Sequence, residues 1–250
     1  MNDAEKYLFD ARGYLVLKNC IEKSVINDVL GVIKELENTD EADFPAGVTY
    51  GKPRSDEEAY ISSVICASEK FKPIVFSPKI LEIMRTVTLG MVRLNHAYSI
   101  SRFAPGGYTY MHMGGSPIHP KGAYLSNNGE IFSITTKAVV PLSHNQIEDG
   151  CFAIIPGSHK SSFKRPFDNH PDNNEGLVPI DAEAGDIIIF TEACAHGSLV
   201  KKSENIRRTL FLCFSVAYMP DWTKLNLVFS DEYLSTLNSE ERKLFNLKVD

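Results

Sequence analysis

The stretch Tyr-Thr-Tyr-Met-His-Met-Gly-Gly-Ser-Pro, residues 108–117, ends an alternating, strand-like run at His112 and then turns on two glycines. A second histidine, His196, follows much later in Ala-His-Gly-Ser, again at the end of a predicted strand. Glycine and serine after each histidine let the backbone bend away and leave the imidazole facing an opening. Imidazole is a common ligand for iron, zinc and copper, so the two histidines are candidates to share one metal ion.

Helices are expected mainly in the first third of the chain, and strands after it. Hydrophobic spacing predicts a first helix from Ser24 to Glu37, with Ser24 as its N-cap. It predicts a second helix that begins at Ser77-Pro78, with Ser77 as the capping serine, and stops at Gly90. Alternation and β-branched residues predict strands over 13–18, 92–103, 130–141, 151–155, 186–191 and 207–218. Residues 38–56 are predicted to form a loop near an active-site mouth, and residues 221–250 a polar helical tail with a weak start signal at Ser239.

Many strands joined by Gly/Pro turns predict a mainly β core with flanking helices, closed as a sandwich, jelly roll or barrel. No internal repeat, low-complexity tract or linker divides the sequence. We therefore expect one domain over 1–250, with an N-terminal helical part at about 1–90, the β core at about 91–220 and a C-terminal tail.

Composition narrows the class of protein. The chain has 250 residues, 43% of them hydrophobic, and no apolar run near the ~20 residues that a spanning helix needs. No secretory signal is visible, so we expect a cytoplasmic protein with no membrane partner. The net charge of −6 argues against a nucleic-acid polymer as partner. Five cysteines without Cys-x-x-Cys spacing predict free thiols.

Four segments, in order, carry a resemblance to a known family. They are His112-Met113-Gly114, the run from Asp149 to Lys160 that contains Ile-Pro-Gly-Ser-His-Lys, Gly185 to Phe190, and His196-Gly197-Ser198 with Arg207 behind it. The chain resembles the phytanoyl-CoA dioxygenase family of Fe(II)/2-oxoglutarate-dependent oxygenases over roughly residues 10–220. The resemblance implies a double-stranded β-helix, a cupin-like jelly roll, with iron in its mouth.

The same resemblance implies roles for individual residues. It makes His112 and His196 iron ligands, and it pairs Arg207 with the distal carboxylate of 2-oxoglutarate. Ser198 is the family's second contact to that carboxylate, with a turn-capping role as the alternative. Arg208 competes with Arg207, since a shift of one residue exchanges the two faces of a strand.

One family residue is missing: Gly114 stands where the family has a carboxylate ligand. Chloride on iron can fill the gap, as in halogenases of this type that carry Ala or Gly there. Water or a more distant group can complete the site of a hydroxylase, with His119, Asp149 and Glu192 nearest in sequence. Alternatively, the site binds no iron and the protein is an inactive small-molecule-binding module.

These observations predict a single-domain enzyme that uses Fe(II), 2-oxoglutarate and O2 on an unactivated C–H bond of a small molecule. Halogenation, with His112, Gly114 and His196 at the centre of catalysis, is the first expectation and hydroxylation the second. His159 and Cys194 are expected to be structural. Arg102, Lys121 and Tyr124 are further candidates to meet a polar or anionic substrate, with a solvated surface position as the alternative for each.

Overall fold

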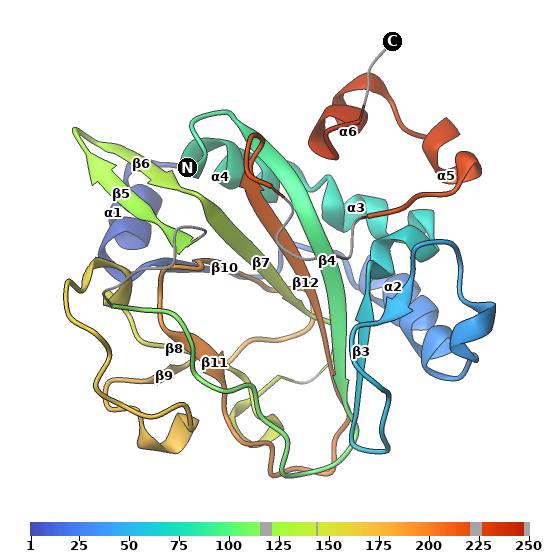
Figure 1. The fold of residues 1–250 in the computed structure, drawn as a ribbon, viewed down its shortest axis with the longest axis horizontal. Coiled ribbons are helices and arrows are strands. Elements are labelled where there is room, and N and C mark those ends of the chain that lie inside the picture. The colour runs from blue at the N-terminus through green and yellow to red at the C-terminus, as the bar shows by residue number, and fades with distance from the viewer. Residues whose placement is uncertain (116–121, 144, 221–226, 248–250) are drawn as a thin grey trace.

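The computed structural model describes residues 1–115, 122–143, 145–220 and 227–247. Its helices are α1 (Asp3–Arg12), α2 (Lys23–Glu37), α3 (Lys72–Val75), α4 (Pro78–Val87), α5 (Asp231–Ser235) and α6 (Ser239–Leu244). Its strands are β1 (Tyr14–Leu17), β2 (Thr49–Tyr50), β3 (Glu58–Ser62), β4 (Val92–Arg102), β5 (Tyr124–Asn127), β6 (Glu130–Ser133), β7 (Thr135–Pro141), β8 (Phe152–Ile154), β9 (Val178–Pro179), β10 (Ile187–Thr191), β11 (His196–Ser198) and β12 (Arg207–Val216). The fold is the expected mainly β jelly roll with flanking helices (Figure 1).

The jelly roll consists of a large sheet and a small one. Seven strands form the large sheet in the order β1-β10-β7-β12-β4-β3-β2, and β11, β8 and β9 form the small one. The strand pairs are antiparallel, as expected for strands that return through Gly/Pro turns. A separate hairpin of β5 and β6 projects from one corner (Figure 1).

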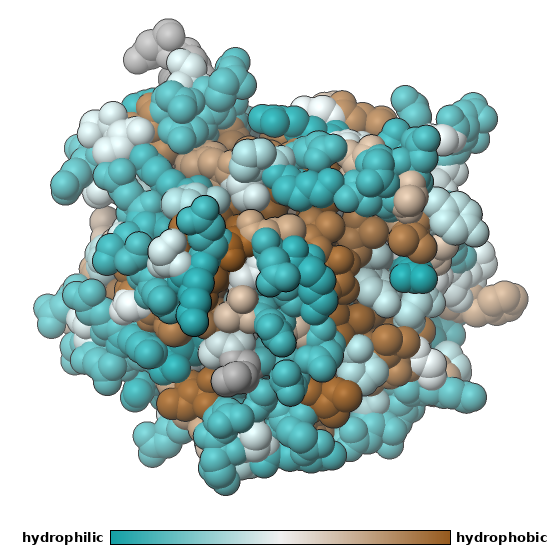
Figure 2. Space-filling model, turned by 180° about the vertical axis from the view of Figure 1, so that it is seen from behind, coloured by the Kyte–Doolittle hydropathy of each residue, from teal (hydrophilic) through white to brown (hydrophobic). Residues whose placement is uncertain are grey.

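The two faces of the large sheet bury different cores. The outer face packs under α2 and α4 in one apolar cluster that includes Ile33, Ile83 and Leu212. The inner face turns toward the small sheet and forms a second cluster, which includes Phe152, Phe190 and Phe211. Seen from behind, the surface is mainly hydrophilic, with hydrophobic side chains visible in a hollow between polar ones (Figure 2).

The alternation of β12 decides between the two arginines at its start. Arg208 lies on the helix-facing side, where its Nε and Nη2 donate to the Glu37 carboxylate of α2 at 2.6–3.1 Å. Arg207 therefore points to the inner face, toward the small sheet. The preference for Arg207 as the inward arginine is confirmed.

Several predicted boundaries differ from the observed ones. Residues 130–141 form two strands, because β6 pairs with β5 whereas β7 enters the large sheet, with Ile134 between them. Residues 38–56 are not wholly loop, since they contain β2. The other predicted strands are present with boundaries shifted by at most two residues, whereas β3, β5 and β9 were not predicted.

Helix starts were the least accurate predictions. Ser24 is not a cap, since α2 begins at Lys23 with Glu22 before it. Ser77 occupies the N-cap of α4, but its side chain makes no capping hydrogen bond there. Helix α1 was missed, although Asn2 and Glu5 form a capping box, and α6 is capped by Asn238 with Glu241 in the same way.

Candidate metal centre

The two histidines are direct backbone partners. His112 lies beside β11 and exchanges both ladder hydrogen bonds with His196, N–H to O at 3.1 Å and 3.0 Å. Directly opposed residues of an antiparallel pair present their side chains on the same face. The imidazole centroids are accordingly 4.1 Å apart. The expectation that these distant histidines meet is thus met by the geometry.

Hydrogen bonds fix how each ring is turned. Nδ1 of His112 lies 2.9 Å from the carbonyl oxygen of Tyr110, and Nδ1 of His196 lies 2.9 Å from that of Cys194. A carbonyl can only accept, so Nδ1 carries the proton in both rings and Nε2 keeps its lone pair. This is the usual arrangement of metal-binding histidines, whose second nitrogen donates to a carbonyl or carboxylate.

Glu192 completes a three-residue group with the two histidines. It follows β10 and is 1% exposed, and its Oε1 lies 3.5 Å from Nε2 of His196. One ligand atom each from His112, Glu192 and His196 lies within 4.8 Å of the others. Two imidazoles and one carboxylate are the donor set of non-haem Fe(II) oxygenases, so the residues present fit iron.

Lys137, on β7, forms an ion pair with the Glu192 carboxylate. Its ammonium lies 2.8 Å from Oε1 of Glu192, and both side chains are buried. Burial alone raises the pKa of Glu192, but Lys137 and the two imidazoles outweigh it and hold that pKa at about 2. Burial and the neighbouring His112 lower the pKa of His196 to about 3, and burial also lowers that of His112. At neutral pH the group therefore has two neutral imidazoles and one ionised carboxylate, the forms that bind metals.

The space that a side chain at position 114 would occupy is already filled by Ala195. The φ of Gly114 is +75°, and a Cβ built there would lie 2.6 Å from Cβ and 2.8 Å from N of Ala195. An aspartate at this position would collide with the residue that precedes His196. The glycine is therefore explained by close backbone packing, which is a reason that the sequence pattern alone did not supply.

A substitution at Gly114 tests this packing. Gly114→Ala is expected to lower the free energy of unfolding by about 2–4 kcal/mol, from about 1–2 kcal/mol of left-handed strain plus overpacking. Gly129→Ala is the matched control, because Gly129 has φ +80° but nothing within 4 Å of an added Cβ. Urea unfolding of both variants gives the comparison. Equal losses of unfolding free energy in the two variants would mean that Ala195 can shift at little cost and that its packing does not require glycine at position 114.

A cavity of about 50 Å³ leads from the histidines into the jelly roll. Its charged or polar lining consists of Arg102, Thr109, His112, Lys137, His196, Ser198 and Arg207. Arg207, which also lines this cavity, donates from Nε to Oδ1 of Asn145 at 2.7 Å and from Nη1 to the carbonyl oxygen of Gly150 at 2.5 Å. Burial and the nearby Arg102 lower the pKa of Arg207 to about 9. Within the part of the chain that the structure describes, the guanidinium donates to neutral acceptors only.

Other predicted site residues lie elsewhere or cannot be placed. His119 and Lys121 fall outside the described residues. Asp149 accepts hydrogen bonds from Ser203 and Asn205 and is not part of the three-residue group. None of residues 38–56 lines the cavity.

The remaining candidates are structural. Tyr124 does not line the cavity beside the histidines. Its hydroxyl donates to Oδ1 of Asp10 in α1 at 2.7 Å. His159 is buried between the Asp10 carbonyl oxygen, 3.0 Å from Nε2, and the Cys194 thiol, 3.3 Å from Nδ1, and it holds the turn as expected. All five cysteines are free, also as expected.

Sequence reasoning missed Lys137 and ranked Glu192 only as one of three nearby candidates. A signal was present for both. Lys137 interrupts the apolar strand 135–141, and Glu192 follows the run Ile187 to Phe190. Charged residues next to buried strands are rarely unpaired, so the two were candidates for each other.

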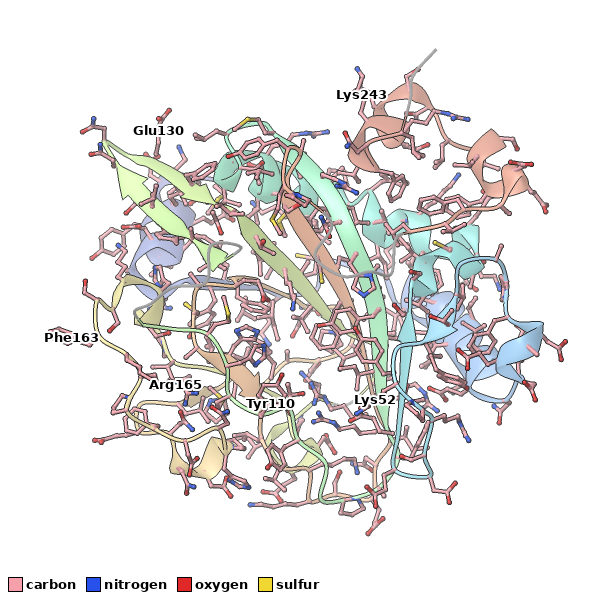
Figure 3. All side chains as sticks on the ribbon, in the orientation of Figure 1. Lys52, Tyr110, Glu130, Phe163, Arg165 and Lys243 are labelled. Carbon is pink, nitrogen blue, oxygen red and sulfur yellow. The ribbon has the colours of Figure 1, made fainter. Side chains whose placement is uncertain are left out.

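Hydrogen bonds from the Arg165 side chain hold the backbone of the segment that contains His112. Arg165, labelled beside Tyr110 in Figure 3, donates from Nη2 to the carbonyl oxygen of Met111 at 3.1 Å. Its Nη1 donates to the carbonyl oxygen of Asp168 and to Oδ1 of Asn174. This network fixes the backbone next to His112.

The fold and this site define a class of protein, the cupin-like non-haem iron oxygenases. The sequence profile "Phytanoyl-CoA dioxygenase (PhyH)" matches residues 9–209. The chain therefore belongs to the phytanoyl-CoA dioxygenase family of Fe(II)/2-oxoglutarate-dependent oxygenases.

Individual relatives agree with this assignment. "Dioxygenase af480" of Aspergillus fumigatus is 34% identical over 103 residues, which cover 40% of this chain and 32% of that protein. The structure of HygX from Streptomyces hygroscopicus with nickel and 2-oxoglutarate has a TM-score of 0.75 at 22% identity, covering 89% of this chain and 90% of HygX. The epimerase SnoN from nogalamycin biosynthesis has a TM-score of 0.66 at 15% identity, covering 90% and 88%. Within the described residues, none of the helices is both long and apolar enough to cross a bilayer.

Proposed function

We propose that this protein is an Fe(II)/2-oxoglutarate-dependent oxygenase whose iron is held by His112, Glu192 and His196, and that it oxidises a C–H bond of a small molecule. The observation that carries the proposal is that one ligand atom from each of His112, Glu192 and His196 lies within 4.8 Å of the others. A cluster of this kind, beside a cavity and already in its metal-binding protonation state, is a candidate for catalysis.

Each residue has a defined part in this proposal. His112 and His196 present Nε2 to the metal because Nδ1 of each ring is held by a carbonyl oxygen. Glu192 supplies the one negative ligand, in place of the carboxylate missing at position 114. When bound, iron and 2-oxoglutarate would supply the oxidising chemistry, in which decarboxylation of the keto acid accompanies reduction of O2.

Arg207 supports the assignment of the cosubstrate. It lines the same cavity as the two histidines. A guanidinium offers a planar pair of donors that matches a carboxylate, and among the described residues this one donates only to an amide and a backbone carbonyl. The distal carboxylate of 2-oxoglutarate provides the missing anion.

Halogenation has less support than hydroxylation or a related oxidation. Chloride was expected to replace a carboxylate that the chain lacks, but Glu192 offers one beside both histidines. Lys137 is the feature that keeps halogenation as the second candidate, because its ion pair can hold Glu192 away from the metal and leave a position open. The inactive-module alternative requires that no divalent metal binds.

The substrate is proposed to be a small molecule. HygX has been crystallised with hygromycin B, and SnoN with nogalamycin RO. These ligands belong to those proteins, and they support only a substrate of similar kind here. The curated relatives are matched over 32% and 40% of their lengths, so their own substrates are not transferred.

The role of Glu192 can be tested by metal binding. Glu192→Gln is expected to weaken Fe(II) binding by more than about 100-fold, because loss of even a supporting partner of a ligand costs 10–100-fold. Glu192→Asp, which keeps a carboxylate on a shorter side chain, should retain part of the affinity. The readout is anaerobic Fe(II) titration by calorimetry, repeated with chloride. If Glu192→Gln binds Fe(II) like the wild type and chloride then perturbs the visible Fe(II)–2-oxoglutarate band, halogenation is favoured instead.

A further inference from the structure

A second buried arginine faces Arg207 across the strands. Arg102 on β4 is directly opposite Arg207 on β12, and the two are 2% and 4% exposed. Like charges directly opposite in an antiparallel pair destabilise a sheet. Two guanidinium groups in this position therefore need an anion that offsets their repulsion.

Arg102 is held firmly by three neighbours. Its Nε donates to Oε2 of Glu58 at 3.1 Å, its Nη1 to Oγ of Ser198 at 2.6 Å and its Nη2 to Oγ1 of Thr109 at 2.7 Å. These bonds leave one N–H on each terminal nitrogen without an acceptor among the described residues. The group is fixed in orientation but still has donors to offer to the cavity that it lines.

Ser198 is fully engaged by these contacts. Its Oγ accepts from Arg102 and from the backbone N–H of Thr109 at 2.8 Å, and it lies 3.3 Å from the carbonyl oxygen of Leu199 as a donor. A hydroxyl has one hydrogen to donate, and here it points to the backbone. Ser198 is thus arranged to hold Arg102 rather than to donate to a ligand.

The local charge is not balanced by protein carboxylates. Glu58 is shared between Arg102 and Lys52, whose ammonium is paired with the other carboxylate oxygen (Lys52 is labelled in Figure 3). Glu58 and Asp149 both act on Arg207 from a distance, but Arg207 bonds to neither, and its pKa is lowered by burial and by Arg102. Arg207 thus brings a positive charge that no directly bonded carboxylate of the described residues neutralises.

We infer that Arg102 and Arg207 together form a two-arginine clamp for the distal carboxylate of 2-oxoglutarate, and that Ser198 is a positioning residue for Arg102. The inference rests on the proposed function, since it assigns a second residue to the cosubstrate end of the same cavity. The clamp gives the carboxylate donors from two strands, so loss of either arginine weakens binding without removing the site.

The test is equilibrium binding, not turnover. Wild type, Arg102→Gln and Arg102→Lys are titrated anaerobically with 2-oxoglutarate in the presence of Fe(II), following the visible charge-transfer band, and then with 2-oxopentanoate as a competitor that lacks the distal carboxylate. Arg102→Gln is expected to weaken 2-oxoglutarate binding by about 10–100-fold, the value of a charge-assisted hydrogen bond, and to leave the affinity for 2-oxopentanoate unchanged. Arg102→Lys keeps the positive charge but loses the planar pair of donors, so its affinity for 2-oxoglutarate should lie between those of the wild type and Arg102→Gln.

The outcomes separate the two proposals. Equal 2-oxoglutarate affinity in wild type and Arg102→Gln overturns the clamp while leaving the proposed function in place. An equal loss for both keto acids also overturns it, because Arg102 would then act only on the shape of the site. If the wild type binds no 2-oxoglutarate at all, the proposed function fails and the clamp fails with it. Thermal unfolding of each variant shows whether it is folded.

Discussion

His196→Ala is expected to lose Fe(II) binding and to reduce 2-oxoglutarate turnover by at least about 1000-fold, the scale of the several kcal/mol that a catalytic metal supplies. The His196 imidazole is buried and its Nε2 lies 3.5 Å from the Glu192 carboxylate, so its removal takes one ligand from the three-residue group. His112→Ala should give a loss of the same order, because its ring stands 4.1 Å from that of His196.

His170→Ala is the control for the histidine variants. His170 lies on a surface loop near Tyr108 and outside the cavity. We expect it to bind Fe(II) and consume 2-oxoglutarate like the wild type. Metal content by anaerobic titration and succinate release by chromatography measure both effects. Full activity of His196→Ala would show that the metal, if any, is bound elsewhere.

Lys137→Met is expected to lower the free energy of unfolding of the metal-free protein by about 3–5 kcal/mol, because it leaves the Glu192 carboxylate buried without a counter-charge. Fe(II) then takes over as the counter-charge of Glu192. The variant should therefore gain more stability from Fe(II) than the wild type does, and by linkage it should bind Fe(II) more tightly.

Two comparisons isolate this coupling. Lys18→Met removes a half-exposed partner of Asp186 at 2.7 Å and should cost less than about 1 kcal/mol. The double variant Lys137→Met/Glu192→Gln should recover most of the lost stability, because no unpaired charge remains. Urea unfolding with and without Fe(II) measures all four proteins. A Lys137→Met variant that is destabilised equally with and without Fe(II) would contradict a contact between Glu192 and the metal.

The parts of this protein that depend on local pattern could be predicted from the sequence. Alternation located β4, and runs of β-branched and other apolar residues located β8, β10 and β12. The two-residue period of a strand separated Arg207 from Arg208. The two histidines were identified because glycine and serine after each were expected to bend the chain, although His196 begins β11 and Gly197 and Ser198 continue that strand. What the sequence did not reveal was that His112 and His196 pair through their backbones, because strand register is a property of the assembled sheet.

The third ligand candidate, Glu192, could not be singled out from the sequence. Position 114 suggested an open site, since the pattern places a carboxylate there and the chain has glycine. The proximity of Glu192 depends on the turn between β10 and β11, and its charge depends on Lys137 from β7, a strand far away in sequence. The capping boxes of α1 and α6 were present in the sequence as Asn2 with Glu5 and Asn238 with Glu241, but they were not recognised.

The most direct test of the account is an anaerobic crystal structure of the wild-type protein with Fe(II), 2-oxoglutarate and excess chloride. We predict that iron will be bonded to Nε2 of His112, Nε2 of His196 and one carboxylate oxygen of Glu192, with no anomalous chloride peak on the metal. Iron bonded to the two histidines and chloride, with Glu192 still paired to Lys137, would contradict the account.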